Sequence, residues 1–274
     1  MPVDAGQAVT MKPWASASPC VFFLLVLCLS IPFYLLGAAG GRLPLLTAQP
    51  TSALMAFMPM IAALILVYRE RGADEAADLA KRALDFDRVR GLRWFLVAVC
   101  LLPIVAVLQY AALRLIGPTL PTPSFVIGEI PIFLVMYFAG ALGEEIGWQG
   151  YAFPALRRRN TALSSALIIG AFWALWHVIP FFQIGRAADW IVWHCLSIVA
   201  LRVIIVWLFV NTGQSIFIAA LFHMMSNLPW SLVENYGSFY DPFITSIILL
   251  VLSGLIVFRW GPAMLTRTEG HTRE

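Results

Sequence analysis

Charged residues are scarce in this chain of 274 residues. Lysine, arginine, aspartate and glutamate make up 12% of it, whereas 61% is hydrophobic and the mean hydropathy is +0.84. One soluble core cannot bury that much apolar surface, so the composition excludes an ordinary soluble domain and indicates an integral membrane protein. The sequence also lacks a basic face with interleaved aromatic residues, which argues against nucleic acid as a partner.

Cysteine is scarce as well. The four cysteines are scattered through or beside apolar runs without paired spacing, at Cys20, Cys28, Cys100 and Cys195. This pattern argues against both a disulfide framework and a thiolate metal site. We expect the four side chains to pack as small apolar groups.

Long apolar segments dominate what remains. A membrane-spanning helix needs roughly 20 mostly apolar residues, and eight segments approach that length: 19–37, 51–68, 92–115, 126–151, 163–182, 190–210, 215–230 and 242–258. The predicted fold class is therefore all-α, a polytopic transmembrane bundle of about eight helices. The first segment could also be a signal peptide cleaved near residues 37–39, but its single flanking lysine and long apolar run favour a retained helix.

Basic residues are distributed unevenly between the loops. If the N-terminus is cytoplasmic, 14 of the 18 Lys and Arg residues fall inside, Arg42, Arg114 and Arg186 fall outside, and Arg202 lies within a span. Positive residues concentrate on the cytoplasmic side of membrane proteins, so both termini are predicted to be cytoplasmic.

The chain divides into three parts. Residues 1–124 would hold the first three transmembrane helices, 125–230 a catalytic core, and 231–274 the last transmembrane helix and a cytoplasmic tail. The longest polar loop, 69–91, has acids and bases at helical spacing, which predicts a cytoplasmic helix near the membrane surface. A solvated connector is the alternative for this loop.

Two adjacent acids, Glu144 and Glu145, interrupt the fourth apolar segment. A charge at the bilayer centre costs on the order of 3 kcal/mol, so such acids are candidates for a functional site, although a packed helix with a buried polar pair is the alternative. Neighbours on a helix point about 100° apart, so the two acids should have different roles. Gln149 shares the face of Glu145 and is expected to hydrogen-bond with it. Small residues that would allow close helix packing follow the same helix, at Gly140, Gly143, Gly147 and Gly150.

Two histidines lie in later apolar segments. His177 precedes Pro180 in an aromatic setting, while His223 and Asn227 share one helical face. Each histidine alone is compatible with simple packing. Together with a glutamate in a cavity of low dielectric, they would supply a base for water, a proton carrier and donors to an oxyanion, which amide hydrolysis requires. We therefore expect a polar cavity within the membrane.

These residues resemble the motifs of the CPBP family of intramembrane proteases, which includes the type II CaaX prenyl endopeptidases and bacteriocin-processing or self-immunity proteins. The family pattern is Glu-Glu-x-x-x-Arg, Phe-x-x-x-His and His-x-x-x-Asn on separate transmembrane helices. The matching residues here are Glu144-Glu145-x-x-x-Gln149, Trp173-x-x-x-His177 and His223-x-x-x-Asn227. The resemblance covers residues 127–228.

The resemblance implies a role for each motif residue. Glu144 with His177 would activate the attacking water, His223 and Asn227 would stabilise the oxyanion, and Glu145 would complete the catalytic group. The family is commonly classed as metalloprotease, so zinc is a candidate cofactor. Glu144, His177 and His223 could supply three ligands with a fourth position open for water, and direct acid–base action by the same residues is the alternative.

Two motif positions depart from the family pattern. Trp173 replaces a phenylalanine and keeps an aromatic wall. Gln149 replaces an arginine and removes a cation that would lie near Glu145. Our hypothesis is that Arg202, the basic residue within a span, supplies the missing charge; the alternative is that it extends to the cytoplasmic interface.

The depth of the acids sets a further condition. If the spans are placed symmetrically, Glu144 lies toward the cytoplasm and His177 toward the outside. The two can meet only if the fourth helix continues past Gly150 toward Arg157, and we predict that it does.

The predicted function is hydrolysis of a peptide bond in a membrane-associated protein or peptide in a bacterial or archaeal membrane, with a prenylated CaaX-like protein as one candidate substrate. If the source is bacterial, a small peptide or membrane protein is the alternative substrate. The expected partners are this substrate and the lipid bilayer; the sequence gives no oligomeric state. A catalytically silent scaffold or immunity protein, or a small proton-coupled transporter, is the alternative, favoured by Gln149.

Overall fold

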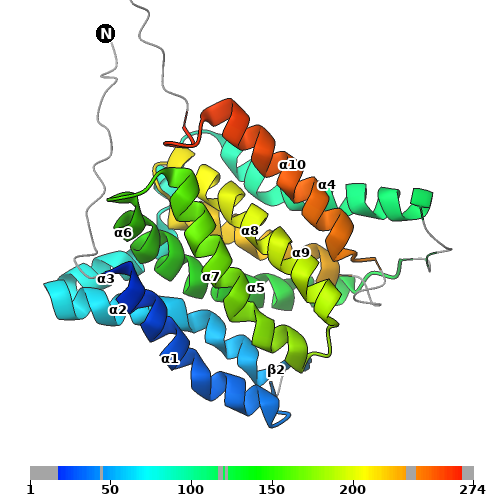
Figure 1. The fold of residues 1–274 in the computed structure, drawn as a ribbon, viewed down its shortest axis with the longest axis horizontal. Coiled ribbons are helices and arrows are strands. Elements are labelled where there is room, and N and C mark those ends of the chain that lie inside the picture. Colours follow the sequence, from blue (N-terminus) through cyan, green and yellow to red (C-terminus); the bar gives the residue numbers. More distant parts are fainter. Residues whose placement is uncertain (1–17, 44–45, 117–119, 121–122, 233–238, 267–274) are drawn as a thin grey trace, which may run out of the picture.

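The protein is a bundle of helices, described by a computed structural model for residues 18–43, 46–116, 120, 123–232 and 239–266 (Figure 1). The predicted fold class is confirmed. One short antiparallel hairpin, β1 (Arg42–Leu43) and β2 (Leu46–Pro50), follows the first helix. The helices are α1 (Pro19–Ala38), η1 (Thr51–Phe57), α2 (Met58–Arg71), α3 (Ala73–Lys81), η2 (Arg82–Leu84), η3 (Phe86–Arg88), α4 (Leu92–Ile116), η4 (Ile127–Glu129), α5 (Ile130–Gly147), η5 (Trp148–Ala152), α6 (Phe153–Arg157), α7 (Ala162–Gln183), α8 (Ala188–Asn211), α9 (Ile216–Ser231) and α10 (Pro242–Trp260).

All eight predicted segments are helical. Within the described residues, seven helices are long and apolar enough to cross a membrane, and the eighth, α9, is a shorter apolar helix. Helix α9 packs against α4, α5 and α8, and many of its side chains are buried. Large apolar side chains cover the outside of the bundle, as expected for contact with lipid. The chain is therefore an integral membrane protein.

The first helix is part of the bundle. The Tyr34 hydroxyl donates to the backbone oxygen of Trp176 at 2.8 Å, and the Trp176 indole donates to the Ser30 hydroxyl at 2.8 Å. These bonds join α1 to α7. They do not test cleavage near residues 37–39.

The loop 69–91 is partly helical. Helix α2 runs to Arg71, and α3, η2 and η3 occupy most of the remainder (Figure 1). The predicted helix is confirmed as α3, which carries Asp74 and Glu75 in its first turn and Lys81 in its last. Such charges complement the helix dipole.

The basic end of α6 lies near the start of α1 and the residues after α10. Arg157 at the end of α6 contacts Met264 after α10, and the backbone of Ala162 at the start of α7 bonds to that of Ala263. The start of α1 lies beside Arg158 and Arg159. Of the predicted cytoplasmic residues, Lys12, Arg267 and Arg273 lie outside the described residues.

The fourth predicted segment forms one long helix. It runs over 31 residues, Ile127–Arg157, with a π-helical turn at Trp148–Ala152 between α5 and α6. The predicted continuation past Gly150 is confirmed. As a result, Glu144 lies near the middle of the segment, at a depth that His177 of α7 also reaches.

A glycine stripe brings this helix against η1 and α2. A Cβ atom on Gly143 would lie 2.8 Å from the backbone oxygen of Ala56, and one on Gly147 would lie 2.5 Å from the backbone of Pro59. A residue larger than glycine at position 143 or 147 would therefore prevent the two backbones from approaching this closely. The predicted close approach is therefore present, and it places the helix that carries the acids against α2.

We expect Gly147→Ala to lower the stability of the protein by about 1–3 kcal/mol, because the added methyl group must displace backbone atoms. Thermal unfolding of the detergent-solubilised protein measures the change. Gly254→Ala is the matched control, since a Cβ there meets no atom within 4 Å. Equal unfolding temperatures for the two variants would contradict the packing argument.

Candidate active site

Glu144 is a buried acid held by two tryptophans. The indole nitrogens of Trp148 and Trp173 donate to its Oε2 at 3.2 and 2.5 Å, and its side chain is 5% exposed. Two N–H donors stabilise a carboxylate without supplying a counter-charge. They fix one oxygen and leave Oε1 available to the neighbouring cavities.

His177 presents one ring nitrogen to the same region. Its Nδ1 lies 2.9 Å from the backbone oxygen of Trp173. A carbonyl oxygen only accepts, so Nδ1 carries the proton, and in the neutral imidazole Nε2 is an acceptor. Ring contacts with Trp176 and Phe181 hold the imidazole in this orientation. His177 can therefore accept a proton through Nε2.

Glu145 points to the opposite side and joins three helices. Its Oε2 accepts from Nη1 of Arg202 on α8 at 2.7 Å, and its Oε1 accepts from Nδ1 of His223 on α9 at 2.8 Å. Both Glu145 and Arg202 are 0% exposed. The predicted contact of Arg202 with the acid pair is confirmed, and the alternative that Arg202 extends to the interface is wrong. A buried charge pair of this kind is stable only while both partners are present.

Asn227 completes the set, one helical turn after His223. Three adjoining cavities of about 140, 200 and 230 Å³ are each lined by Glu144 and Asn227. His177 lines the first two, and His223 lines the first and third. The residues from α5, α7 and α9 that the sequence motifs single out thus converge on one polar region inside an apolar bundle.

Gln149 does not hydrogen-bond to Glu145, so that prediction is wrong. Among the described residues, neither amide atom of its buried side chain has a hydrogen-bond partner. There are two reasons. Gln149 lies in the π-helical turn, where the wider spacing changes the face on which a residue falls. Arg202 and His223 already occupy both oxygens of Glu145.

Trp173 does more than form an aromatic wall. Besides its hydrogen bond to Glu144, its ring lies 4.1 Å from the guanidinium carbon of Arg202. A phenylalanine could make the second contact but not the first. In the sequence, the feature that could have indicated the hydrogen bond to Glu144 is the indole N–H that a tryptophan carries. The same holds for Trp148.

The three residues predicted as zinc ligands make other contacts in this arrangement. Within the described ranges, no three His, Cys, Asp or Glu side chains are grouped closely enough to hold a metal ion. Oε2 of Glu144 is engaged by two indoles, and the Nδ1 atoms of His177 and His223 by a carbonyl and a carboxylate. Zinc ligation by these three residues therefore stays a prediction, and no step below depends on it.

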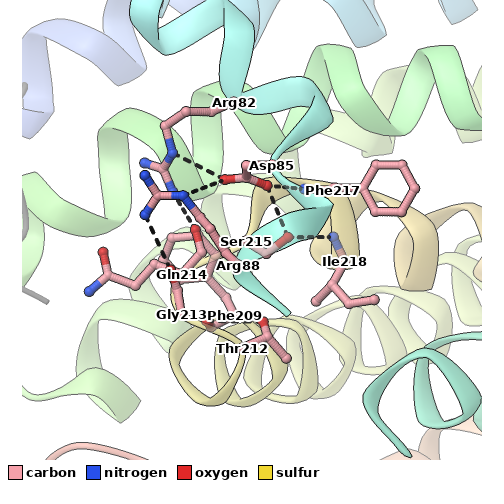
Figure 2. A network of polar contacts seen from close by, with 10 residues as sticks. All are labelled: Arg82, Asp85, Arg88, Phe209, Thr212, Gly213, Gln214, Ser215, Phe217 and Ile218. Carbon is pink, nitrogen blue, oxygen red and sulfur yellow. Dashed lines mark hydrogen bonds and ion pairs between the residues drawn. The ribbon is translucent and has the colours of Figure 1, made fainter. Parts of the chain in front are cut away.

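A second polar network fixes the start of α9 (Figure 2). Asp85, between η2 and η3, accepts hydrogen bonds from the Ser215 hydroxyl at 2.9 Å and from the backbone N–H of Phe217 at 3.0 Å. The Ser215 hydroxyl accepts in turn from the backbone N–H of Ile218 at 3.2 Å. These bonds cap the first turn of the helix that carries His223 and Asn227.

Two arginines complete this network. Arg82 and Arg88 lie 3.3 and 3.6 Å from Asp85 and donate to the backbone oxygens of Gln214 and Gly213 (Figure 2). Burial lowers the pKa of Arg82, and the nearby Asp85 carboxylate opposes that shift. Gly213 has φ +64°, and a Cβ there would lie 3.0 Å from the backbone oxygen of Arg88. The network thus attaches the segment before α4 to the α8–α9 turn, which sequence patterns did not indicate.

We expect Arg202→Met to destabilise the protein by about 3–5 kcal/mol, because it leaves the Glu145 carboxylate buried without its cation. Chemical or thermal unfolding in detergent measures the loss. Adding Glu145→Gln to this variant should restore part of the stability. Arg259→Met is the control, since Arg259 is exposed at the end of α10. A loss no greater than that of the control would contradict the assignment.

Asp85→Ala should loosen the start of α9 and lower any activity that depends on His223, at a cost of about 1–2 kcal/mol in stability for the lost cap. Hydrogen exchange at Phe217 and Ile218 measures the loosening. Asp87→Ala, at an exposed position of the same turn, is the matched control. Unchanged exchange at both amides would show that Asp85 does not hold the helix.

Fold and site together define a polytopic membrane protein with an acid, two imidazoles and a carboxamide around cavities inside its helix bundle. Residues 126–229 match the family described as "Type II CAAX prenyl endopeptidase Rce1-like". The chain is 26% identical over 185 residues to "CAAX prenyl protease 2" of Methanococcus maripaludis, covering 62% of this chain and 67% of that protein. The matched segment is thus similar to the type II CAAX prenyl endopeptidase family, which is the resemblance that its motifs predicted.

Proposed function

We propose that this protein is an intramembrane endopeptidase that hydrolyses a peptide bond near the C-terminus of a membrane-associated, prenylated CaaX-like protein or peptide. The observation that carries the proposal is the convergence of Glu144, His177, His223 and Asn227 on cavities within the bundle. The match of residues 126–229 to the family and the printed name of the archaeal relative support the same class of reaction.

The side chains suggest the following steps. Water bound between Oε1 of Glu144 and Nε2 of His177 loses a proton to this pair and attacks the scissile carbonyl carbon. The Asn227 amide donates to the resulting oxyanion. His223 contributes a second donor through Nε2 when its ring is doubly protonated. The proton taken from water then passes to the leaving amine as the C–N bond breaks.

Glu145 and Arg202 act on the reaction through His223. Their ion pair holds the His223 ring by Nδ1 and thereby aims Nε2 toward the cavities. Arg202 places a cation against the acid pair from another helix, so the absence of an arginine at position 149 does not remove the charge. The replacement of the family's arginine by Gln149 was the argument for a silent scaffold or a transporter, and the position of Arg202 weakens it.

The proposed orientation places both termini in the cytoplasm. The basic end of α6 supports it, because Arg157, Arg158 and Arg159 lie beside the start of α1 and the residues after α10. The opposite end of the bundle carries the β1–β2 hairpin and the turn between α7 and α8. The network around Asp85 then faces the cytoplasm.

Glu144→Gln should lower kcat at least about 100-fold, because the amide cannot accept a proton from water. Cleavage of a quenched fluorescent farnesylated peptide by the purified protein in detergent measures the rate. Glu129→Gln, at an exposed position in the same span, is the matched control. Assays after chelation and after zinc addition test the zinc prediction in the same preparation. Undiminished cleavage by Glu144→Gln would refute the mechanism.

A further inference from the structure

The cavity of about 140 Å³, called here the inner cavity, has a second polar end. Besides the four site residues, its lining includes His194 and Ser197 of α8 and Tyr240 just before α10. The rest of the wall is mostly apolar, from Leu102, Val105, Phe181, Ile198, Leu201 and Leu249. A cavity of about 150 Å³ can hold a benzene-sized group, so one apolar side chain fits between the two ends.

His194 is held in a fixed orientation at this second end. Its Nδ1 hydrogen-bonds with the Tyr240 hydroxyl, and its ring stacks on Trp190 with centroids 4.6 Å apart. The Phe181 ring makes a T-shaped contact with the imidazole, with centroids 4.8 Å apart, and fixes it from another direction. This hydrogen bond uses Nδ1 and not Nε2, the second nitrogen of the ring. No family motif includes this histidine, and the proposed hydrolysis does not use it.

The two ends of the inner cavity differ in charge. Glu144 brings a carboxylate to one end, which disfavours an anion there. Among the described lining residues, the other end has His194, Ser197 and Tyr240 and no carboxylate. The anionic group of a bound molecule is therefore less disfavoured beside His194 than beside Glu144.

We propose that His194 and Tyr240 form a subsite for the free C-terminal carboxylate of the peptide substrate. This inference rests on the proposed endopeptidase function and deepens it. A scissile carbonyl at Glu144 and a carboxylate at His194 would place a short apolar leaving segment in the inner cavity. When the Tyr240 hydroxyl donates to Nδ1 of His194, Nε2 carries the proton and its N–H is a suitable donor to a carboxylate. Tyr240 then acts by fixing this tautomer. The subsite would thus select substrates cleaved near a free C-terminus.

Three farnesylated peptides that differ only at the C-terminus test the proposal: the free acid, its amide, and the acid lengthened by two residues. The wild-type protein should cleave the free acid with a kcat/KM at least about 10-fold above that of the amide, mainly through KM, because a hydrogen bond to a charged group is lost. The lengthened peptide should also be a poorer substrate.

Two variants remove the subsite without removing the rings that shape it. His194→Phe and Tyr240→Phe should bring the acid-to-amide ratio close to 1 while leaving cleavage of the amide within about threefold of wild type. His194→Gln, which retains a donor, should give an intermediate ratio. Tyr110→Phe is the matched control: Tyr110 packs on Phe239, next to Tyr240, but does not line the inner cavity. It should keep the wild-type ratio.

The outcomes separate this proposal from the one on which it rests. A wild-type ratio near 1, or an unchanged ratio in Tyr240→Phe, would overturn the subsite while the endopeptidase proposal stands. If the wild-type protein cleaves none of the three peptides, the proposed function fails and the subsite fails with it. If His194→Phe does not fold, Tyr240→Phe still decides, because it removes a single oxygen atom.

Discussion

One buried carboxylate, that of Glu145, sets the arrangement of the helices that carry the site. A charge inside an apolar bundle must be paired, because the cost of leaving it alone is several kcal/mol. Its two partners come from different helices, Arg202 from α8 and His223 from α9. Both helices are therefore held against α5 at the depth of the acid pair. The rest of the site takes its geometry from that junction.

The neighbouring acid, Glu144, is stabilised in a different way. It is one residue away and points in another direction, where Trp148 and Trp173 donate neutral hydrogen bonds to it. A cation in contact with Glu144 would make it a weaker base in the proposed mechanism, and the Glu145–Arg202 pair keeps that cation on the other side. Trp173 lies between the two acids' environments, since its N–H reaches Glu144 and its ring packs on Arg202.

Helix α9 is held at two points along its length. His223 is held by Glu145 inside the bundle, and the first turn is capped by Asp85 from the segment before α4 (Figure 2). A helix held at both points has little freedom to shift His223 or Asn227 relative to Glu144. Preorganisation of this kind is what stabilisation of a developing oxyanion requires.

The sequence alone determined the apolar segments, the membrane class, the two acids with separate roles, and the three motifs whose residues line the cavities. The first three follow from composition, from segment length and from the 3.6-residue period, which are local properties, whereas the motifs were identified by their resemblance to a known family. The need to pair a buried charge also allowed Arg202 to be chosen as the partner.

Only the tertiary structure decided how the remaining side chains meet. A π-helical turn moved Gln149 away from Glu145, two indoles took one oxygen of Glu144, Asp85 reached α9, and His194 joined the inner cavity. The physical reason is that such contacts depend on the spacing and rotation of helices distant in the chain, which local periodicity does not encode.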